Sequence, residues 1–303
     1  MRLFGFQYTI DGSVTFDVDT LKPKTVNSPA DAAAFEQVIL RLLHDINEDT
    51  AVGRHVLQSL WIGNEVGFLP GTVLAAKAIT KTPGDVLPKG CTDGKFTGTG
   101  KGAPAAVFIN PFTLASAQGP AAQKDAMLLH ELFHALRMSA GLLQRRPMMR
   151  YDDLEEFYAV TISNMYVSSK YPGQALRGDH RTMLLHKIDY PDRVRGLMSN
   201  PGLEENALYY FAMGHRAELV QIIKEMPMLC SNLGKAPCKF NPFRVAFNGY
   251  DPNVEDKDRP PERRHKNPYG PFVDSPASIW STLPEPSQKQ KDMFRDTMLD
   301  RAL

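Results

Sequence analysis

The residues whose types and spacing could do chemistry lie in one string, LLHELFHALRMSAG, at positions 128–141. It places His130 and His134 four positions apart, with Glu131 directly after the first histidine. Side chains four apart lie one turn above another on a helix, so both imidazoles can bind one metal ion while Glu131 points to its open side. Zinc suits such ligands and lowers the pKa of bound water from about 15.7 to near 7. The string therefore predicts a hydrolytic zinc site.

The same pattern arises by chance in about one chain of this length in a hundred. Its neighbours favour a metal site, because they are apolar on almost every side of the expected helix: Met127, Leu128, Leu129, Leu132, Phe133, Ala135 and Leu136. Polar side chains in a buried helix cost several kcal/mol unless a metal ion or hydrogen bonds satisfy them. A metal ion would explain why three polar side chains occur there.

A third ligand must come from another part of the chain. The metzincin continuation requires glycine and histidine where this chain has Arg137 and Ala140, which excludes that class. The string RYDDLEEFYAVTISNMY follows, and it predicts a helix over 153–169. This helix offers two carboxylates in its first turns, Glu155 and Glu156.

The start of this second helix decides between the two glutamates. Asp152 followed three positions later by Glu155 has the form of a capping box, which would occupy the Glu155 carboxylate. Glu156 would then be free to face inward with Ala159 and Val160. We therefore favour Glu156 as the third ligand, with Glu155 as the alternative.

These two strings together resemble a known group of enzymes. HELFHALRMSAG followed by EEFYAV is similar to the gluzincin division of zinc metallopeptidases. More narrowly, it is similar to the zincin-like effectors and toxins of bacteria, including the NleD-like type III effector proteases. The segment 156–159 resembles the string that holds the zinc-binding glutamate of anthrax lethal factor. The resemblance covers the region from about residue 125 to 170.

The resemblance implies a mechanism and a substrate class. It implies that His130, His134 and Glu156 are zinc ligands. It implies that Glu131 is the general base in the hydrolysis of a protein or peptide substrate. It also implies that the strand at 107–110 lies at a sheet edge and pairs with extended substrate by strand addition. An interior strand is the alternative interpretation of that segment.

Two supporting roles complete the expected site. Metal-bound imidazoles donate their other N–H to an oxygen, for which the candidates are Asp152, Asp153 and Asn164. The developing oxyanion needs a side-chain donor. Tyr151 is the first choice, because it precedes the ligand helix as a catalytic tyrosine does in lethal-factor-like enzymes; the other candidates are Tyr158, Tyr166, His180 and His186. The remaining histidines are interpreted as structural or surface residues: His44, His55, His215 and His265.

The elements that must position these residues predict an α+β fold. Alternating apolar residues on both sides of Asp11-Gly12 predict a β-hairpin at 3–18, and the run AAVFINP predicts a strand at 105–111. Helical spacing of apolar residues predicts helices near 29–47, 50–61, 119–139 and 203–224. We expect a zincin-like domain at 1–245, in which a small mixed sheet packs on several helices. A Pro-rich extended segment with a C-terminal helix is expected at 246–303.

Composition and charge limit the partners. The chain has 35 Lys and Arg against 34 Asp and Glu, a formal charge of +1, which argues against nucleic acid as the main partner. No apolar run reaches about eighteen residues, so no membrane span is expected. The N-terminus is strand-like and does not resemble a secretory signal. The three cysteines are expected as free thiols, with a Cys230–Cys238 disulfide as the alternative and Cys91 unpaired.

The function that these residues favour is zinc-dependent hydrolysis of peptide bonds by an endopeptidase. The resemblance implies a bacterial effector or toxin that is cytoplasmic in the producing cell or exported by a specialised secretion system. A secretion component, a chaperone or an immunity protein is then the expected partner. Two other functions stay open. A zinc amidase or peptidase acting on cell-wall peptides would use the same ligands, and a catalytically silent zincin would serve as a binding module.

Overall fold

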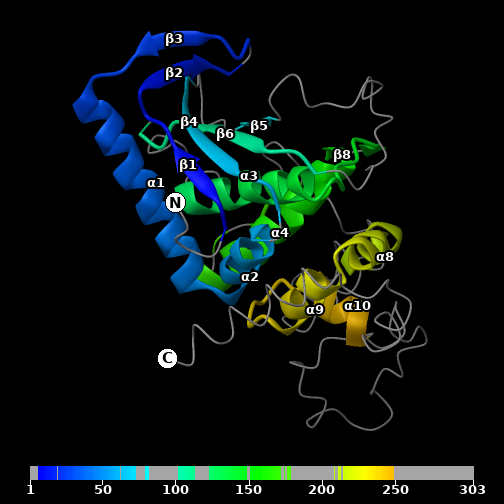
Figure 1. The fold of residues 1–303 in the computed structure, drawn as a ribbon. Coiled ribbons are helices and arrows are strands. Elements are labelled where there is room, and N and C mark those ends of the chain that lie inside the picture. The colour runs from blue at the N-terminus through cyan, green and yellow to red at the C-terminus, as the bar shows by residue number, and fades with distance from the viewer. Residues whose placement is uncertain are drawn as a thin grey trace, which may run out of the picture.

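The described part of the chain forms an α+β fold, as predicted (Figure 1). The computed structural model describes residues 6–18, 20–61, 63–72, 79–81, 102–112, 123–148, 151–171, 174, 176–178, 208, 211–212 and 214–248. The predictions for Cys91, His180, His186 and His265, and for most of 246–303, lie outside these residues. The division of the chain at residue 246 therefore stays a prediction.

A six-stranded mixed sheet forms one layer of the fold. Its strands are β1 (Tyr8–Ile10), β2 (Val14–Asp17), β3 (Pro23–Val26), β4 (Val66–Thr72), β5 (Ile79–Lys81) and β6 (Ala105–Ile109). The order across the sheet is β3-β2-β4-β6-β5, with β1 also paired to β4. β4 is parallel to β1, β2 and β6, whereas β5 runs antiparallel to β6. β6 confirms the strand predicted from AAVFINP.

The predicted hairpin at 3–18 is wrong. β1 and β2 both run parallel to β4, β1 along its first half and β2 along its second half. The Asp11 N–H donates to the carbonyl of Phe68 at 3.0 Å, so the chain continues along β4 instead of turning. A Cβ on Gly12 would lie 2.6 Å from the carbonyl oxygen of Ala32, so this glycine allows a close helix contact. The hairpin in this region is the antiparallel pair β2–β3.

The first two helices confirm the sequence signals. α1 (Pro29–Asp49) and α2 (Ala51–Leu60) match the helices expected near 29–47 and 50–61. The Ser28 hydroxyl accepts the N–H of Asp31 at the start of α1, and Thr50 caps α2 in the same way. These side chains satisfy amide groups that have no partner within the helix.

The two helices that carry the motifs follow. α3 (Lys124–Ser139) begins after Gln123, which is later than the start expected at 119. It ends before Gly141, whose φ of 70° is the left-handed conformation that favours glycine after a helix. α4 (Leu154–Lys170) confirms the second motif helix. The short strands β7 (Pro147–Met148) and β8 (Asp152–Asp153) pair with each other between α3 and α4.

Three further helices complete the described part: α8 (Arg216–Glu225), α9 (Pro227–Lys235) and α10 (Pro242–Asn248). α8 accounts for the last part of the helix expected over 203–224. Cys230 and Cys238 are buried free thiols, as predicted. None of the helices in the described ranges has the length and apolar character that a membrane crossing requires.

α3 is the central helix of the fold. It packs against β5 and β6 on one side and against α4 on the other, with α1 and α2 beside it (Figure 1). Every side chain from Leu128 to Ser139 is buried, including those of His130, Glu131 and Arg137. Because α3 has no exposed face over these turns, each of its polar groups must find a partner inside the protein or bind a ligand.

Candidate metal centre

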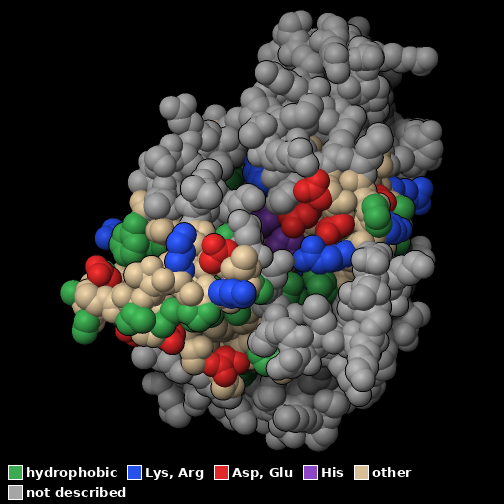
Figure 2. Space-filling model, turned by 90° about the horizontal axis from the view of Figure 1, so that it is seen from above, with side chains coloured by type: hydrophobic (Ala, Val, Ile, Leu, Met, Phe, Trp, Pro, Cys, Tyr) green, Lys and Arg blue, Asp and Glu red, His purple; other side chains and the backbone are tan. Residues whose placement is uncertain are grey.

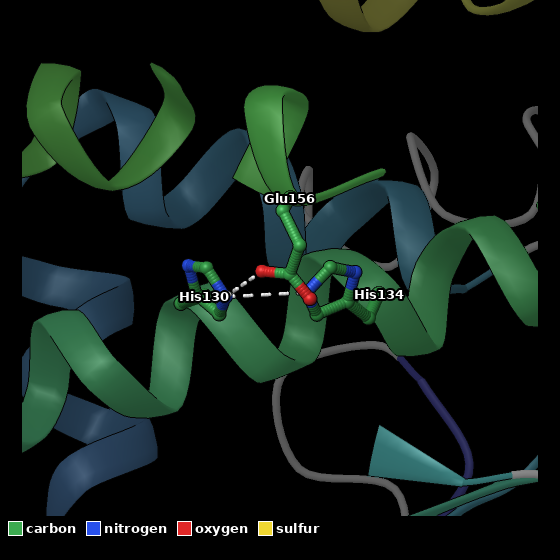
Figure 3. Close-up of side chains that lie close together, drawn as sticks. All are labelled: His130, His134 and Glu156. Atoms are coloured by element: carbon green, nitrogen blue, oxygen red, sulfur yellow. Dashed lines mark hydrogen bonds and ion pairs between the residues drawn. The ribbon is translucent and has the colours of Figure 1, made fainter. Parts of the chain in front are cut away.

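His130 and His134 of α3 meet Glu156 of α4 (Figure 3). The two Nε2 atoms lie 3.2 Å apart. Nε2 of His130 lies 3.1 Å from one carboxylate oxygen of Glu156, and Nε2 of His134 lies 3.4 Å from the other. Within the described residues, this is the one group of three side chains whose ligand atoms come close enough to share a metal ion.

The distances among these atoms fit a metal ion. Zinc with bonds of about 2.0–2.1 Å in a tetrahedron separates neighbouring ligand atoms by about 3.3–3.4 Å. The separations of 3.2 Å between the two Nε2 atoms and 3.1 Å between Nε2 of His130 and Oε2 of Glu156 are close to that value. The contact of 3.4 Å from Nε2 of His134 is to the other oxygen, Oε1. The Nε2 atoms of both histidines and the Glu156 carboxylate face one another, so a single ion can contact all three side chains. The residues present therefore fit a divalent cation.

Glu156 is the most exposed member of the triad. Figure 2 shows histidine side chains at the bottom of a hollow, with acidic and basic side chains around it. The side chain of Glu156 is 14% exposed, compared with 4% for His130 and 7% for His134. The carboxylate therefore lies on the solvent side of the two imidazoles, where a water molecule or a substrate group can approach.

When no cation is bound, the triad holds one proton. Burial lowers the pKa of His130. Burial also lowers the pKa of His134, but the negative charge of Glu156 outweighs burial and raises that pKa to about 9. Burial would raise the pKa of Glu156, but the two imidazoles hold it well below its usual range. At pH 7 a charged His134 faces a charged Glu156, and a metal ion must displace the proton.

The first turn of α4 places Glu156, and not Glu155, beside the histidines. The capping residue is Asp153, whose Oδ1 accepts the Glu156 N–H at 3.1 Å. The predicted capping box from Asp152 to Glu155 is therefore wrong by one residue. Asp152 lies outside the helix in the left-handed region, with a φ of 58°. Glu156 therefore faces the histidines without the capping box that the sequence predicts at Asp152.

Glu155 is instead held by Arg137. Its carboxylate accepts the Arg137 Nε–H at 2.6 Å and the backbone N–H of Gln144 at 2.6 Å. Arg137 also donates to Glu225 of α8 at 2.9 Å, and its guanidinium lies over the Tyr158 ring at 4.8 Å. We call these groups the Arg137 cluster: Arg137, Gln144, Glu155, Tyr158 and Glu225. The arginine inside an otherwise apolar helix pattern was the one sequence signal for it.

Glu131 lies outside the triad. The residue is 6% exposed, and its carboxylate accepts a hydrogen bond at 2.7 Å from the hydroxyl of Thr80 on β5. The same hydroxyl lies 2.9 Å from the backbone carbonyl oxygen of Glu131. No sequence pattern pointed to Thr80, because it lies 51 positions from Glu131 in a strand that the sequence did not predict.

Tyr151, the predicted oxyanion donor, is buried at the start of the α4 region. Its ring lies edge-on to Phe157 at 5.1 Å and to His215 at 5.9 Å. The hydroxyls of two alternative candidates donate elsewhere, Tyr158 to the carbonyl of Glu218 and Tyr166 to Asp125. The role of Tyr151 stays a prediction. His215 had been interpreted as structural or surface, and it packs in this aromatic group.

The residues expected to support the imidazoles make other contacts. Asp153 caps α4 and accepts a bond from Arg145 at 3.3 Å. The Asn164 amide exchanges two hydrogen bonds with the backbone of Arg177, at 2.7 and 2.8 Å. Neither they nor Asp152 bonds to Nδ1 of His134, which has no partner within the described ranges. For that histidine the prediction was wrong.

The strand at 107–110 is not a sheet edge. β6 pairs with β4 on one side and with β5 on the other, where Ile79–Lys81 faces residues 106–108. The prediction that this strand receives substrate is therefore wrong, and the alternative, an interior strand, is confirmed. In the described sheet the terminal strand on this side is β5.

The fold and the site define an α+β protein with a His-x-x-x-His pair and a glutamate that could hold a metal ion. Comparisons with known protein families, with curated proteins and with solved structures found no match to this chain.

Proposed function

We propose that the protein is a zinc-dependent peptidase that hydrolyses peptide bonds in a protein or peptide substrate. The observation that carries this proposal is the arrangement of one base beside three ligands. The ligand atoms of His130, His134 and Glu156 lie within 4.8 Å of one another, and Glu131, which directly follows His130 on α3, is not part of this group. Three ligands leave a fourth position for water, which is the arrangement of catalytic zinc sites.

Each side chain has a definite task in this proposal. Zinc held by His130, His134 and Glu156 would supply Lewis acidity, which lowers the pKa of water and polarises a carbonyl group. Glu131 accepts the proton of the attacking water and passes it to the nitrogen of the leaving amine. Its burial at 6% exposure keeps bulk water from competing for that proton.

The edge of the described sheet supports a peptide as substrate. An extended chain binds to a free strand edge through backbone hydrogen bonds. β5 is the last strand on its side of the described sheet, and its Thr80 contacts Glu131. A peptide paired with β5 would therefore lie next to the proposed base. The resemblance of residues 125–170 to effector and toxin proteases supports a protein of another cell as the target.

The test combines metal analysis with two variants. We expect about one zinc ion per chain and cleavage of unfolded casein. Glu131→Gln should keep the zinc and lose about 100- to 10,000-fold in kcat, because general base catalysis contributes that much. His134→Ala should lose both zinc and activity. His44→Ala is the control, since its side chain is 66% exposed and lies outside the triad.

The outcomes separate the alternatives. A Glu131→Gln variant with full activity would refute the mechanism. Cleavage of isolated peptidoglycan peptides, without cleavage of casein, would instead show a cell-wall amidase or peptidase. Zinc binding with no hydrolysis of either substrate would indicate a binding module.

A further inference from the structure

We propose that Thr80 is a positioning residue that holds the Glu131 carboxylate outside the metal-ligand set. Its hydroxyl keeps the Glu131 carboxylate free as the base, while Glu156 reaches the metal site from α4. This inference rests on the proposed metal centre and, for its effect on catalysis, on the proposed peptidase function.

Two carboxylates compete for the same cation. Glu131 follows His130 directly on α3, and Glu156 reaches both imidazoles from α4. Both offer carboxylate oxygens within a buried site, and a divalent ion can bind either of them. A carboxylate oxygen bound to the metal would no longer be free to accept a proton from water. The proposed chemistry therefore requires a group that keeps one glutamate away.

Thr80 is the group in contact with that glutamate. Its hydroxyl lies 2.7 Å from Oε2 of Glu131 and is the carboxylate's one hydrogen-bond partner within the described residues. Thr80 is itself only 4% exposed, so water does not readily replace it. A hydrogen bond to a carboxylate is among the stronger hydrogen bonds in proteins. This bond is enough to favour one side-chain conformation of Glu131 by more than tenfold.

The fold fixes the direction of this hydroxyl. Thr80 pairs with Val107 of β6, and β6 pairs with β4 at the centre of the sheet. Its branched side chain has few rotamers, so the strand backbone largely sets the position of the oxygen. α3 packs directly on β5 and β6. The distance from Thr80 to Glu131 is therefore set by the packing of the sheet on the helix.

Cobalt(II) tests this inference without requiring activity, because its visible absorption reports the number and geometry of its ligands. Thr80→Val keeps the side-chain shape and removes the hydroxyl. In the Co²⁺-loaded full chain we expect it to change the spectrum to that of a higher coordination number, as Glu131 joins the ligands. Thr80→Ser should keep the wild-type spectrum. On a Glu131→Ala background, Thr80→Val should cause no further change.

Kinetics with unfolded casein provide the second measurement. We expect Thr80→Val to lower kcat about 10- to 100-fold, since a misplaced base costs about that much. KM should change little, and Thr80→Ser should recover most of the rate. The matched control is Thr161→Val on α4, another buried threonine, whose hydroxyl has no partner among the described residues. It should leave both the spectrum and kcat unchanged.

The results that would overturn the inference are specific. An unchanged cobalt spectrum in Thr80→Val would overturn it. So would an equal spectral change on the Glu131→Ala background, because the effect would then not pass through Glu131. If wild type binds cobalt but cleaves no casein, the peptidase proposal fails and the spectra still decide the role of Thr80. If wild type binds no cobalt, the metal centre and this inference fail together.

Discussion

Two polar clusters lie side by side on the same two helices. On α3, Arg137 follows His134 by three positions, and on α4 Glu155 directly precedes Glu156. The Arg137 cluster pairs its charges within the protein, through bonds of 2.6–2.9 Å. The triad instead brings three ligand atoms together and leaves Nδ1 of His134 without a partner among the described residues. A cluster that satisfies itself stabilises the fold, whereas one that does not is a candidate for function.

The protonation of the two clusters also separates a structural role from a functional one. Burial alone would lower the pKa of Arg137, but Glu155 and Glu225 hold it above its usual range. Arg137 therefore stays charged at every pH of interest. In the triad His134 can lose its proton, and a cation can take the place of that proton. The charge of Arg137 is therefore permanent, whereas the proton of the triad can be exchanged for a metal ion.

The largest expected effect is the loss of folding stability when the Arg137 cluster is broken. Arg137→Met should lower the free energy of unfolding of the metal-free protein by about 3–5 kcal/mol, because it leaves Glu155 buried without its cation. Urea unfolding monitored by circular dichroism measures this. The control is Arg146→Met, which removes a pair with Glu218 from a side chain that is 56% exposed and should cost less than about 1 kcal/mol. Equal losses in the two variants would contradict a structural role of the Arg137 cluster.

The second prediction concerns stabilisation of the protein by zinc bound at the triad. Free zinc at about 1,000 times its dissociation constant should stabilise the wild-type protein by about 4 kcal/mol, since the metal binds only the folded state. His134→Ala should lose this increase while keeping most of the metal-free stability. Arg137→Met should keep it if the protein folds. An increase that survives His134→Ala would show that zinc binds elsewhere in the chain.

The two clusters also show which parts of the site can be predicted from the sequence. The histidine pair follows from helical periodicity, because it needs only residues of one helix. Glu225 lies 88 positions from Arg137, and no local pattern carries information about such a contact. The same limit explains the wrong hairpin. Asp11-Gly12 is a local turn signal, but pairing with β4, more than fifty positions away, decides the path of the chain. Site residues could therefore be predicted from the sequence where they all lie on one helix, and contacts between distant elements could not.

The pH dependence of metal binding tests the exchangeable proton. The pKa of His134, raised to about 9, means that this imidazole is protonated at pH 7 when no cation is bound. The metal needs the neutral imidazole, so apparent affinity should rise about tenfold per pH unit from 7 toward 9 and then level off. His130 should add little, because its pKa is lowered. Calorimetry at pH 7 in buffers of different ionisation enthalpy should show about one proton released per zinc. No released proton would contradict the ion pair between His134 and Glu156.

The smallest expected effect tests the cap that separates the clusters. The Asp153 side chain caps α4, in which Glu156 faces the histidines and Glu155 faces Arg137. Asp153→Ala should cost about 1 kcal/mol of unfolding free energy, as for other helix caps. Asp153→Asn should recover most of this, because the amide oxygen also accepts the N–H.

Asp152→Asn is the matched control for the cap. Asparagine tolerates the left-handed conformation that Asp152 adopts, with a φ of 58°, so the substitution should change stability by less than about 0.5 kcal/mol. If Asp152→Asn costs as much as Asp153→Ala, the helix begins one residue earlier than the structure shows. Asp152, and not Asp153, would then be the capping residue.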